Sequence, residues 1–118
     1  MGRRSRRRQQ AAAEPAATTD YADAEGNVLT VRDSLSPGTL RELEKLRASP
    51  AASHDDLWHR RGELLFERLA VRWSIAGLPL EGQKELLGRY RMADSETRRW
   101  VRETLERHLA ERHPDAAA

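Results

Sequence analysis

The large apolar side chains of this 118-residue chain are concentrated in one segment, and this limits where a folded core can form. Residues 28–109 hold 26 Val, Ile, Leu, Met, Phe, Trp and Tyr side chains, whereas residues 1–27 hold only two. A segment so poor in apolar side chains cannot offset the roughly 1–2 kcal/mol per residue that backbone ordering costs. We therefore expect residues 1–20 to be a disordered arm, residues 114–118 a short disordered tail, and a single domain between them.

The expected arm carries its own charge. Its arginines within the first eight residues are Arg3, Arg4, Arg6, Arg7 and Arg8. The remainder has 16 basic against 19 acidic side chains, a net charge of −3, so the arm makes the whole chain basic. Such a block can neutralise nucleic-acid phosphates without reading sequence, although no aromatic side chain is interleaved to stack on bases. A passive arm is the alternative interpretation.

Composition excludes several classes of protein and site. The chain has no cysteine, which removes disulfides, Cys-ligated zinc, iron–sulfur clusters and thiol nucleophiles. Its apolar runs are far shorter than the ~20 residues that span a bilayer, and no apolar stretch follows the arginines as an export signal requires. We therefore expect a cytoplasmic protein with no membrane partner. Its 19 arginines against 2 lysines are typical of a high-GC, bacterial gene.

One short segment near the start of the domain has the pattern of a strand. Residues 28–32, Val-Leu-Thr-Val-Arg, alternate in hydrophobicity and follow the turn signal Glu-Gly-Asn. Residues 18–22 can pair with them as a hairpin around residues 23–27. A lone hairpin is marginal in water, so residues 21–35 are expected to rest on helices or to meet another chain.

From residue 36 onward the spacing predicts four helices. Ser36 caps a helix that runs to about Arg47, and Ser53 begins a second helix that ends at Ala76 before a C-terminal glycine. Leu78 opens a third, and Asp94 caps a fourth that runs to His113. Short connections favour antiparallel packing. The expected fold class is therefore mainly α, a small antiparallel bundle over residues 36–113.

The expected second helix has apolar residues on two sides, with arginines between them. A helix apolar over more than half its circumference is central to a domain or to an oligomer. The flank rich in aromatic residues is the predicted interaction surface, since aromatic and arginine side chains are enriched at interfaces. It consists of Trp58, Phe66, Arg68, Leu69, Arg72 and Trp73. A protein partner or a second copy of the chain in a homodimer would use it.

The residue spacings in this chain do not match those of known phosphate-binding loops or helical metal sites. The segment from Gly77 to Lys84 lacks the Gly-Lys-Ser/Thr ending of a phosphate loop, and we interpret it as a turn between helices. The histidines occur in pairs five residues apart, not the three or four that bring two ligands to one helix face. His108, among apolar positions, is expected to be a hydrogen-bonded, partly buried histidine. We expect no catalytic residue, metal or cofactor, and no enzyme.

Residues 83–101 resemble a helix-turn-helix motif in their opening glutamine and apolar positions. The resemblance implies that Arg98, Arg99 and Arg102 face a DNA groove. Leu87 and Arg91 depart from the pattern, since they stand where the motif has alanine and glycine. Arginines and glutamates four residues apart also fit a solvated ion-pair row.

The sequence thus favours a non-enzymatic interaction or adaptor protein that works through helix faces. The alternative is a nucleic-acid-associated protein that binds phosphates through the N-terminal arginines and the helix-turn-helix-like region.

Overall fold

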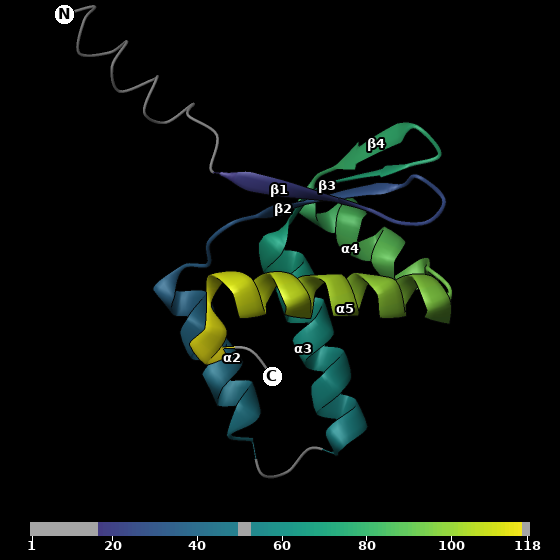
Figure 1. Cartoon of the computed structure of the whole chain (residues 1–118). Coiled ribbons are helices and arrows are strands. Elements are labelled where there is room, and N and C mark those ends of the chain that lie inside the picture. The colour runs from purple at the N-terminus through teal and green to yellow at the C-terminus, as the bar shows by residue number, and fades with distance from the viewer. Residues whose placement is uncertain (1–16, 50–52, 117–118) are drawn as a thin grey trace, which may run out of the picture.

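The protein is described by a computed structural model that covers residues 17–49 and 53–116. It has two layers: a sheet on one side, and all four described α-helices on the other (Figure 1). The elements in chain order are β1 (Thr18–Ala22), β2 (Val28–Arg32), α2 (Pro37–Arg47), α3 (His54–Leu69), β3 (Ala70–Ile75), β4 (Leu78–Glu81), α4 (Gln83–Met92), α5 (Ser95–Arg112) and the short 3-10 helix η1 (Pro114–Ala116).

The four strands form one antiparallel sheet in the order β1-β2-β3-β4, so the expected mainly-α bundle is wrong and the fold is α+β. The expected helix over residues 53–76 ends at Leu69, and the chain continues directly into β3. Residues 70–75 alternate polar and apolar side chains, which suits a half-buried strand. As a strand, this segment pairs with β2, so the first hairpin becomes part of a sheet that can bury one face.

The third expected helix begins five residues later than predicted, because residues 78–81 are β4. Ala76 and Gly77 form the tight turn between β3 and β4, with φ angles of 52° and 80°, not a turn between helices. Positive φ at both central positions is typical of two-residue hairpin turns, whose twist matches that of the strands. Glycine adopts this conformation freely, whereas alanine is strained in it.

The N-terminal hairpin is confirmed. Thr18 pairs with Arg32 and Ala22 with Val28, around the predicted turn over residues 23–27. The Asp23 carboxylate holds this turn, because it accepts hydrogen bonds from the backbone N–H groups of Glu25 and Asn27, both at 2.9 Å. Since β1 begins at Thr18, the end of the expected arm belongs to the sheet. Residues 1–16, and with them the five N-terminal arginines, lie outside the described residues.

The predicted helix caps are also confirmed. Ser36 accepts from Thr39 N at 3.2 Å, Ser53 from Asp56 N at 3.1 Å, and Asp94 from Thr97 N at 2.7 Å. The hydrogen bonds from Thr97 hold the pKa of Asp94 below its usual value.

The core lies between the sheet and the helices. Leu29 and Trp73 are register partners on the inner face, and both are buried. Trp73 meets Phe66 of α3 edge-on, with ring centroids 5.8 Å apart, and Phe66 stacks on Tyr90 of α4 at 4.8 Å. Leu105 and Leu109 bring α5 into the same cluster. In the part of the chain that is described, no helix is long and apolar enough to cross a membrane.

Candidate protein-binding surface

Half of the predicted interaction surface is inside the domain. Phe66, Leu69 and Trp73 are each only 1% exposed, so these side chains are not available to a partner in this structure. The reason is the change from helix to strand after Leu69. This change places Trp73 on the inner face of the sheet, directly over Phe66.

The arginines between the two apolar flanks serve different elements and form no common row. Arg68 donates to Glu42 of α2 at 3.1 Å, and Arg72 lies on the open face of the sheet, 3.9 Å from Glu81. Arg61 forms a largely buried ion pair with Glu106 of α5 at 2.9 Å. These pairs join α2, α3, α5 and the β3–β4 hairpin.

Trp58 is the predicted interaction residue that the structure leaves as an exposed aromatic side chain. It lies near the start of α3 and is 43% exposed. The guanidinium of Arg102 on α5 sits over its ring, with Cζ 5.8 Å from the ring centroid. An apolar hollow of about 190 Å³ between α2 and α3 adjoins the ring and is lined in part by Leu46 and Leu57. We call Trp58, Arg102, Leu46 and Leu57 the Trp58 surface.

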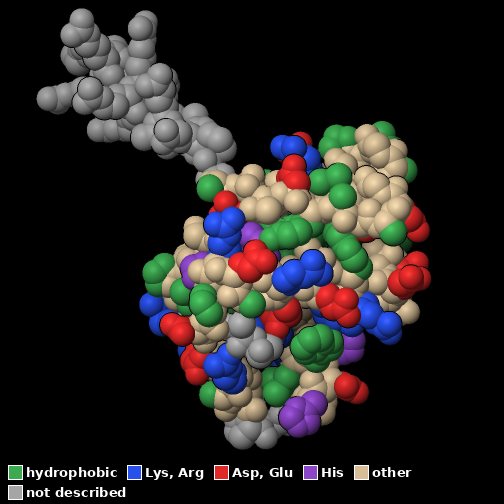
Figure 2. Space-filling model, viewed as in Figure 1, with side chains coloured by type: hydrophobic (Ala, Val, Ile, Leu, Met, Phe, Trp, Pro, Cys, Tyr) green, Lys and Arg blue, Asp and Glu red, His purple; other side chains and the backbone are tan. Residues whose placement is uncertain are grey.

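Arg98, Arg99 and Arg102 do not share one exposed face. Arg99 is exposed, whereas Arg98 and Arg102 are partly buried and their Nε atoms have no hydrogen-bond partner among the described residues. Helices α4 and α5 are joined by a turn of two residues, shorter than the three or four of a helix-turn-helix motif. Arg102 leans back onto Trp58 of α3. On the face seen in Figure 2, basic and acidic side chains are interspersed without a continuous basic patch.

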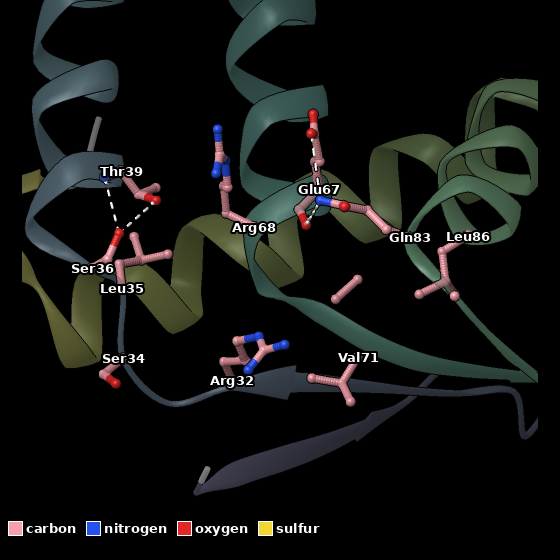
Figure 3. Close-up of a pocket in the computed structure, with 12 residues that line it drawn as sticks. Arg32, Ser34, Leu35, Ser36, Thr39, Glu67, Arg68, Val71, Gln83 and Leu86 are labelled. Atoms are coloured by element: carbon pink, nitrogen blue, oxygen red, sulfur yellow. Dashed lines mark hydrogen bonds between the residues drawn. The ribbon is translucent and has the colours of Figure 1, made fainter. Parts of the chain in front are cut away.

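The largest hollow is an open cleft of about 580 Å³ beside the sheet (Figure 3). It lies between the start of α2, the end of α3 and the start of α4. Gln83 donates to the Glu67 backbone carbonyl at 3.3 Å, and Ser36 and Thr39 bond to each other, so most of its polar groups are internally paired. The Arg32 side chain lines it without a hydrogen bond or ion pair among the described residues. Glu67 is the single carboxylate that lines it, which provides no acid–base pair.

His108 is confirmed as a hydrogen-bonded histidine, and it is 1% exposed. Its Nε2 lies 2.7 Å from the Arg32 carbonyl and its Nδ1 lies 2.7 Å from the Tyr21 hydroxyl. Because the carbonyl can only accept, Nε2 donates to it, and Nδ1 and the Tyr21 hydroxyl share the second hydrogen bond. This contact ties β1, the end of β2 and α5 together. Within residues 17–49 and 53–116, no three His, Asp or Glu side chains are grouped as a metal site.

Sequence reasoning identified Trp58 and Arg102 separately but could not show that they touch. It missed Gly62, one turn after Trp58 on α3, where a Cβ would come within 2.8 Å of Arg102 Cδ. The one sequence signal of this close approach is a glycine inside a helix. Glycine destabilises a helix relative to alanine, so its presence there suggests that a neighbour leaves no room for a Cβ. No family model, no curated protein and no solved structure matches this chain.

Proposed function

We propose that this chain is a non-enzymatic protein-interaction module and that its partner binds at the Trp58 surface. The observation that carries the proposal is the exposed indole of Trp58, held by Arg102 and bordered by an apolar hollow. Tryptophan and arginine in contact with a pocket are the side chains that contribute most to binding at protein interfaces. The other large exposed apolar side chains, Leu78 and Met92, line none of the hollows described above.

The charges around Trp58 indicate the chemistry of the partner. Arg61 is neutralised by Glu106, but Arg102 has no carboxylate within salt-bridge distance among the described residues. An arginine whose charge is not compensated attracts a carboxylate or phosphate across an interface. The surface therefore suits an amphipathic segment that presents an apolar side chain to the hollow and a negative charge to Arg102.

The alternative, nucleic-acid binding, depends mainly on Arg3, Arg4, Arg6, Arg7 and Arg8. From residue 17 onward the chain has 16 basic and 18 acidic side chains, a net charge of −2. A domain of this charge attracts a polyanion weakly, so deletion of residues 1–10 should abolish binding to duplex DNA or RNA at ~150 mM salt if the arm is responsible. A salt-dependent gel shift measures this.

Site-specific cross-linking tests the proposed surface. A photoreactive amino acid at position 58 should form a product with one partner protein, while the same group at exposed Leu78 should not. With the purified partner, Trp58→Ala should weaken binding at least tenfold and Met92→Ala should leave it unchanged, because only the first removes a central aromatic anchor. A product between two copies of this chain would identify the partner as the chain itself. Equal effects of both variants would refute the surface.

A further inference from the structure

A second, smaller hollow lies beside the Trp58 surface, where α3, α4 and α5 meet. It has a volume of about 60 Å³, and the side chains that line it are His59, Glu63, Tyr90, Arg91, Arg98 and Arg102. Arg102 contributes to the Trp58 surface and to this hollow. Its guanidinium lies over Trp58, and the residue also lines the hollow.

Tyr90 brings its hydroxyl to this hollow. The residue is 3% exposed, and its ring stacks on Phe66 in the core. Its hydroxyl makes no hydrogen bond with another described residue and is not one of the buried unpaired atoms, so it is open to the hollow. Gly62 leaves room for it, because a Cβ at that position would lie 3.3 Å from the Tyr90 oxygen.

Two guanidinium groups at the hollow carry uncompensated charge. The Nε atoms of Arg98 and Arg102 are buried without a hydrogen-bond partner in the described part of the chain. Arg98 acts on Asp94 only at a distance, where it helps to lower the pKa of that carboxyl, and it forms no salt bridge within the described ranges. Arg91 differs, because Glu63 accepts its hydrogen bond at 2.8 Å and neutralises it. The hollow is thus lined by two arginines without a salt-bridge partner among the described residues and by one hydroxyl.

We propose that this hollow binds a phosphate monoester group. Two guanidiniums and a hydroxyl match a dianion whose several oxygens each accept hydrogen bonds, whereas a carboxylate would engage only one arginine bidentately. A volume of about 60 Å³ equals that of roughly two water molecules, which suits a phosphate group and excludes a nucleotide base. The inference rests on the proposed function in one respect, that the phosphate is carried by the protein segment seated on Trp58.

The test uses the full chain labelled with ¹⁵N, observed through the Nε–H NMR signals of its arginines. Inorganic phosphate should shift the Arg98 and Arg102 signals saturably, while chloride at equal ionic strength should not. A peptide with phosphoserine between leucines should bind at least tenfold more tightly than inorganic phosphate and than its unphosphorylated form. The peptide arm distinguishes a phosphorylated segment from free phosphate as the source of the group.

Conservative variants separate the hollow from general electrostatics. Tyr90→Phe keeps the stacked ring and should weaken phosphate binding about tenfold, as loss of one hydrogen bond to a charged group does. Arg98→Gln should weaken it at least as much, and Arg99→Gln, one position along α5 and exposed, should have no effect. Equal weakening by Arg98→Gln and Arg99→Gln, or no saturable shift with phosphate, would overturn the inference.

The two proposals can fail separately. Leu46→Ala, which lines the apolar hollow of the Trp58 surface and not this one, should change inorganic phosphate binding by no more than about twofold and should reduce the advantage of the peptide. Phosphate binding without any peptide advantage would refute the protein segment as its carrier and leave the hollow in place. Stronger binding of a short DNA duplex than of the phosphopeptide would overturn the assignment to a monoester.

Discussion

Trp58 and Trp73 belong to one continuous stretch of chain and end in opposite environments. Trp58 is 43% exposed on α3, whereas Trp73 is 1% exposed on β3. The sequence pattern places both on the same flank of a single helix. The difference arises at Leu69, where the helix ends and the side-chain period changes from 3.6 to 2. Identical side chains in one segment therefore take the role of core or of surface according to the local backbone.

The surroundings of the two indoles differ as much as their exposure. Trp73 packs between Phe66, at 5.8 Å, and the guanidinium of Arg89, at 5.7 Å. Its Nε1 is buried without a hydrogen bond among the described residues. Trp58 is in contact with Arg102 on one side and opens to solvent on the other. The first ring is held by packing and the second is partly free to be covered.

Truncation of Trp73 should have the largest effect on stability. Trp73→Ala leaves a cavity between sheet and helices and should lower the free energy of unfolding by about 3–5 kcal/mol. Urea denaturation followed by circular dichroism measures it. A loss below about 1 kcal/mol would contradict the position of Trp73 in the core.

The contact between Tyr21 and His108 should have an intermediate effect. Tyr21→Phe removes the hydroxyl that is hydrogen-bonded to Nδ1 of buried His108, and it should cost about 1–2 kcal/mol. The same denaturation experiment measures the loss. Thr18→Ala, on the same strand but with an exposed side chain, is the matched control and should change stability by less than about 0.5 kcal/mol.

Tyr21 should also make the free energy of unfolding vary with pH in the alkaline range. Burial, with a contribution from Glu111, raises the pKa of Tyr21 above its ordinary value of 10.0. Above pH 10 the unfolded chain loses the phenolic proton before the folded chain does, so the free energy of unfolding should fall as pH rises. Thermal melts between pH 9 and 11 should show a steeper decline for the natural chain than for Tyr21→Phe. Parallel declines would contradict this assignment.

A substitution in the turn between β3 and β4 should have a smaller effect, and it should stabilise the fold. Ala76→Asn should raise stability by about 0.5–1 kcal/mol, because Asn-Gly suits a turn with two positive φ angles. Within a continuous helix the same change would destabilise, since asparagine is a poorer helix former than alanine. Gly77→Ala should destabilise the turn through its φ of 80°. Melting temperatures of both variants separate strand from helix.

Trp58→Ala should destabilise the fold less than Trp73→Ala does. The variant loses one cation–π contact and the buried part of a ring that is 43% exposed, so the free energy of unfolding should fall by about 1–2 kcal/mol. Urea denaturation of this variant and of Trp73→Ala under the same conditions measures the difference. A loss comparable to that of Trp73→Ala would show that both rings belong to the core and would remove the basis for a binding surface.

Local signals in the sequence predicted much of the fold. The Asp23–Asn27 turn and the alternation of residues 28–32 predicted the first hairpin, and Ser36, Ser53 and Asp94 predicted three helix starts. Each depends on a hydrogen bond or a period that spans a few neighbouring residues. The signal for each feature is therefore contained in a few neighbouring residues, although the hairpin also needs β3 to be stable.

The second hairpin was missed because its sequence signals fit a helix as well as they fit two strands and a turn. Gly77 suits a helix C-terminus as well as a tight turn, and residues 70–75 fit a helical wheel as well as a strand. Residues 70–75 form a strand because they pair with the edge of β2. The third helix was expected to open at Leu78, but residues 78–81 are the edge strand β4, where the missing N–H of Pro79 is tolerated.

The candidate site was only partly predictable for the same reason. Trp58 and Arg102 could be singled out by residue type, but their contact depends on how α5 crosses α3. The Tyr90 hydroxyl gave no signal, since an apolar position in α4 predicts only that the ring is buried. Its role depends on three helices that meet at Gly62.

The bond between Tyr21 and His108 also bears on how the chain folds as it is synthesised. Its two residues are separated by 87 positions, and at ribosomal rates of ~5–20 residues per second the second follows the first by about 4–17 s. During the first part of that interval the N-terminal hairpin lacks β3, and it lacks the complete α5 throughout, so the apolar face of Leu29 and Val31 is uncovered. Until β3 is made, β2 is an unpaired edge strand, the kind of edge through which chains pair with one another and aggregate.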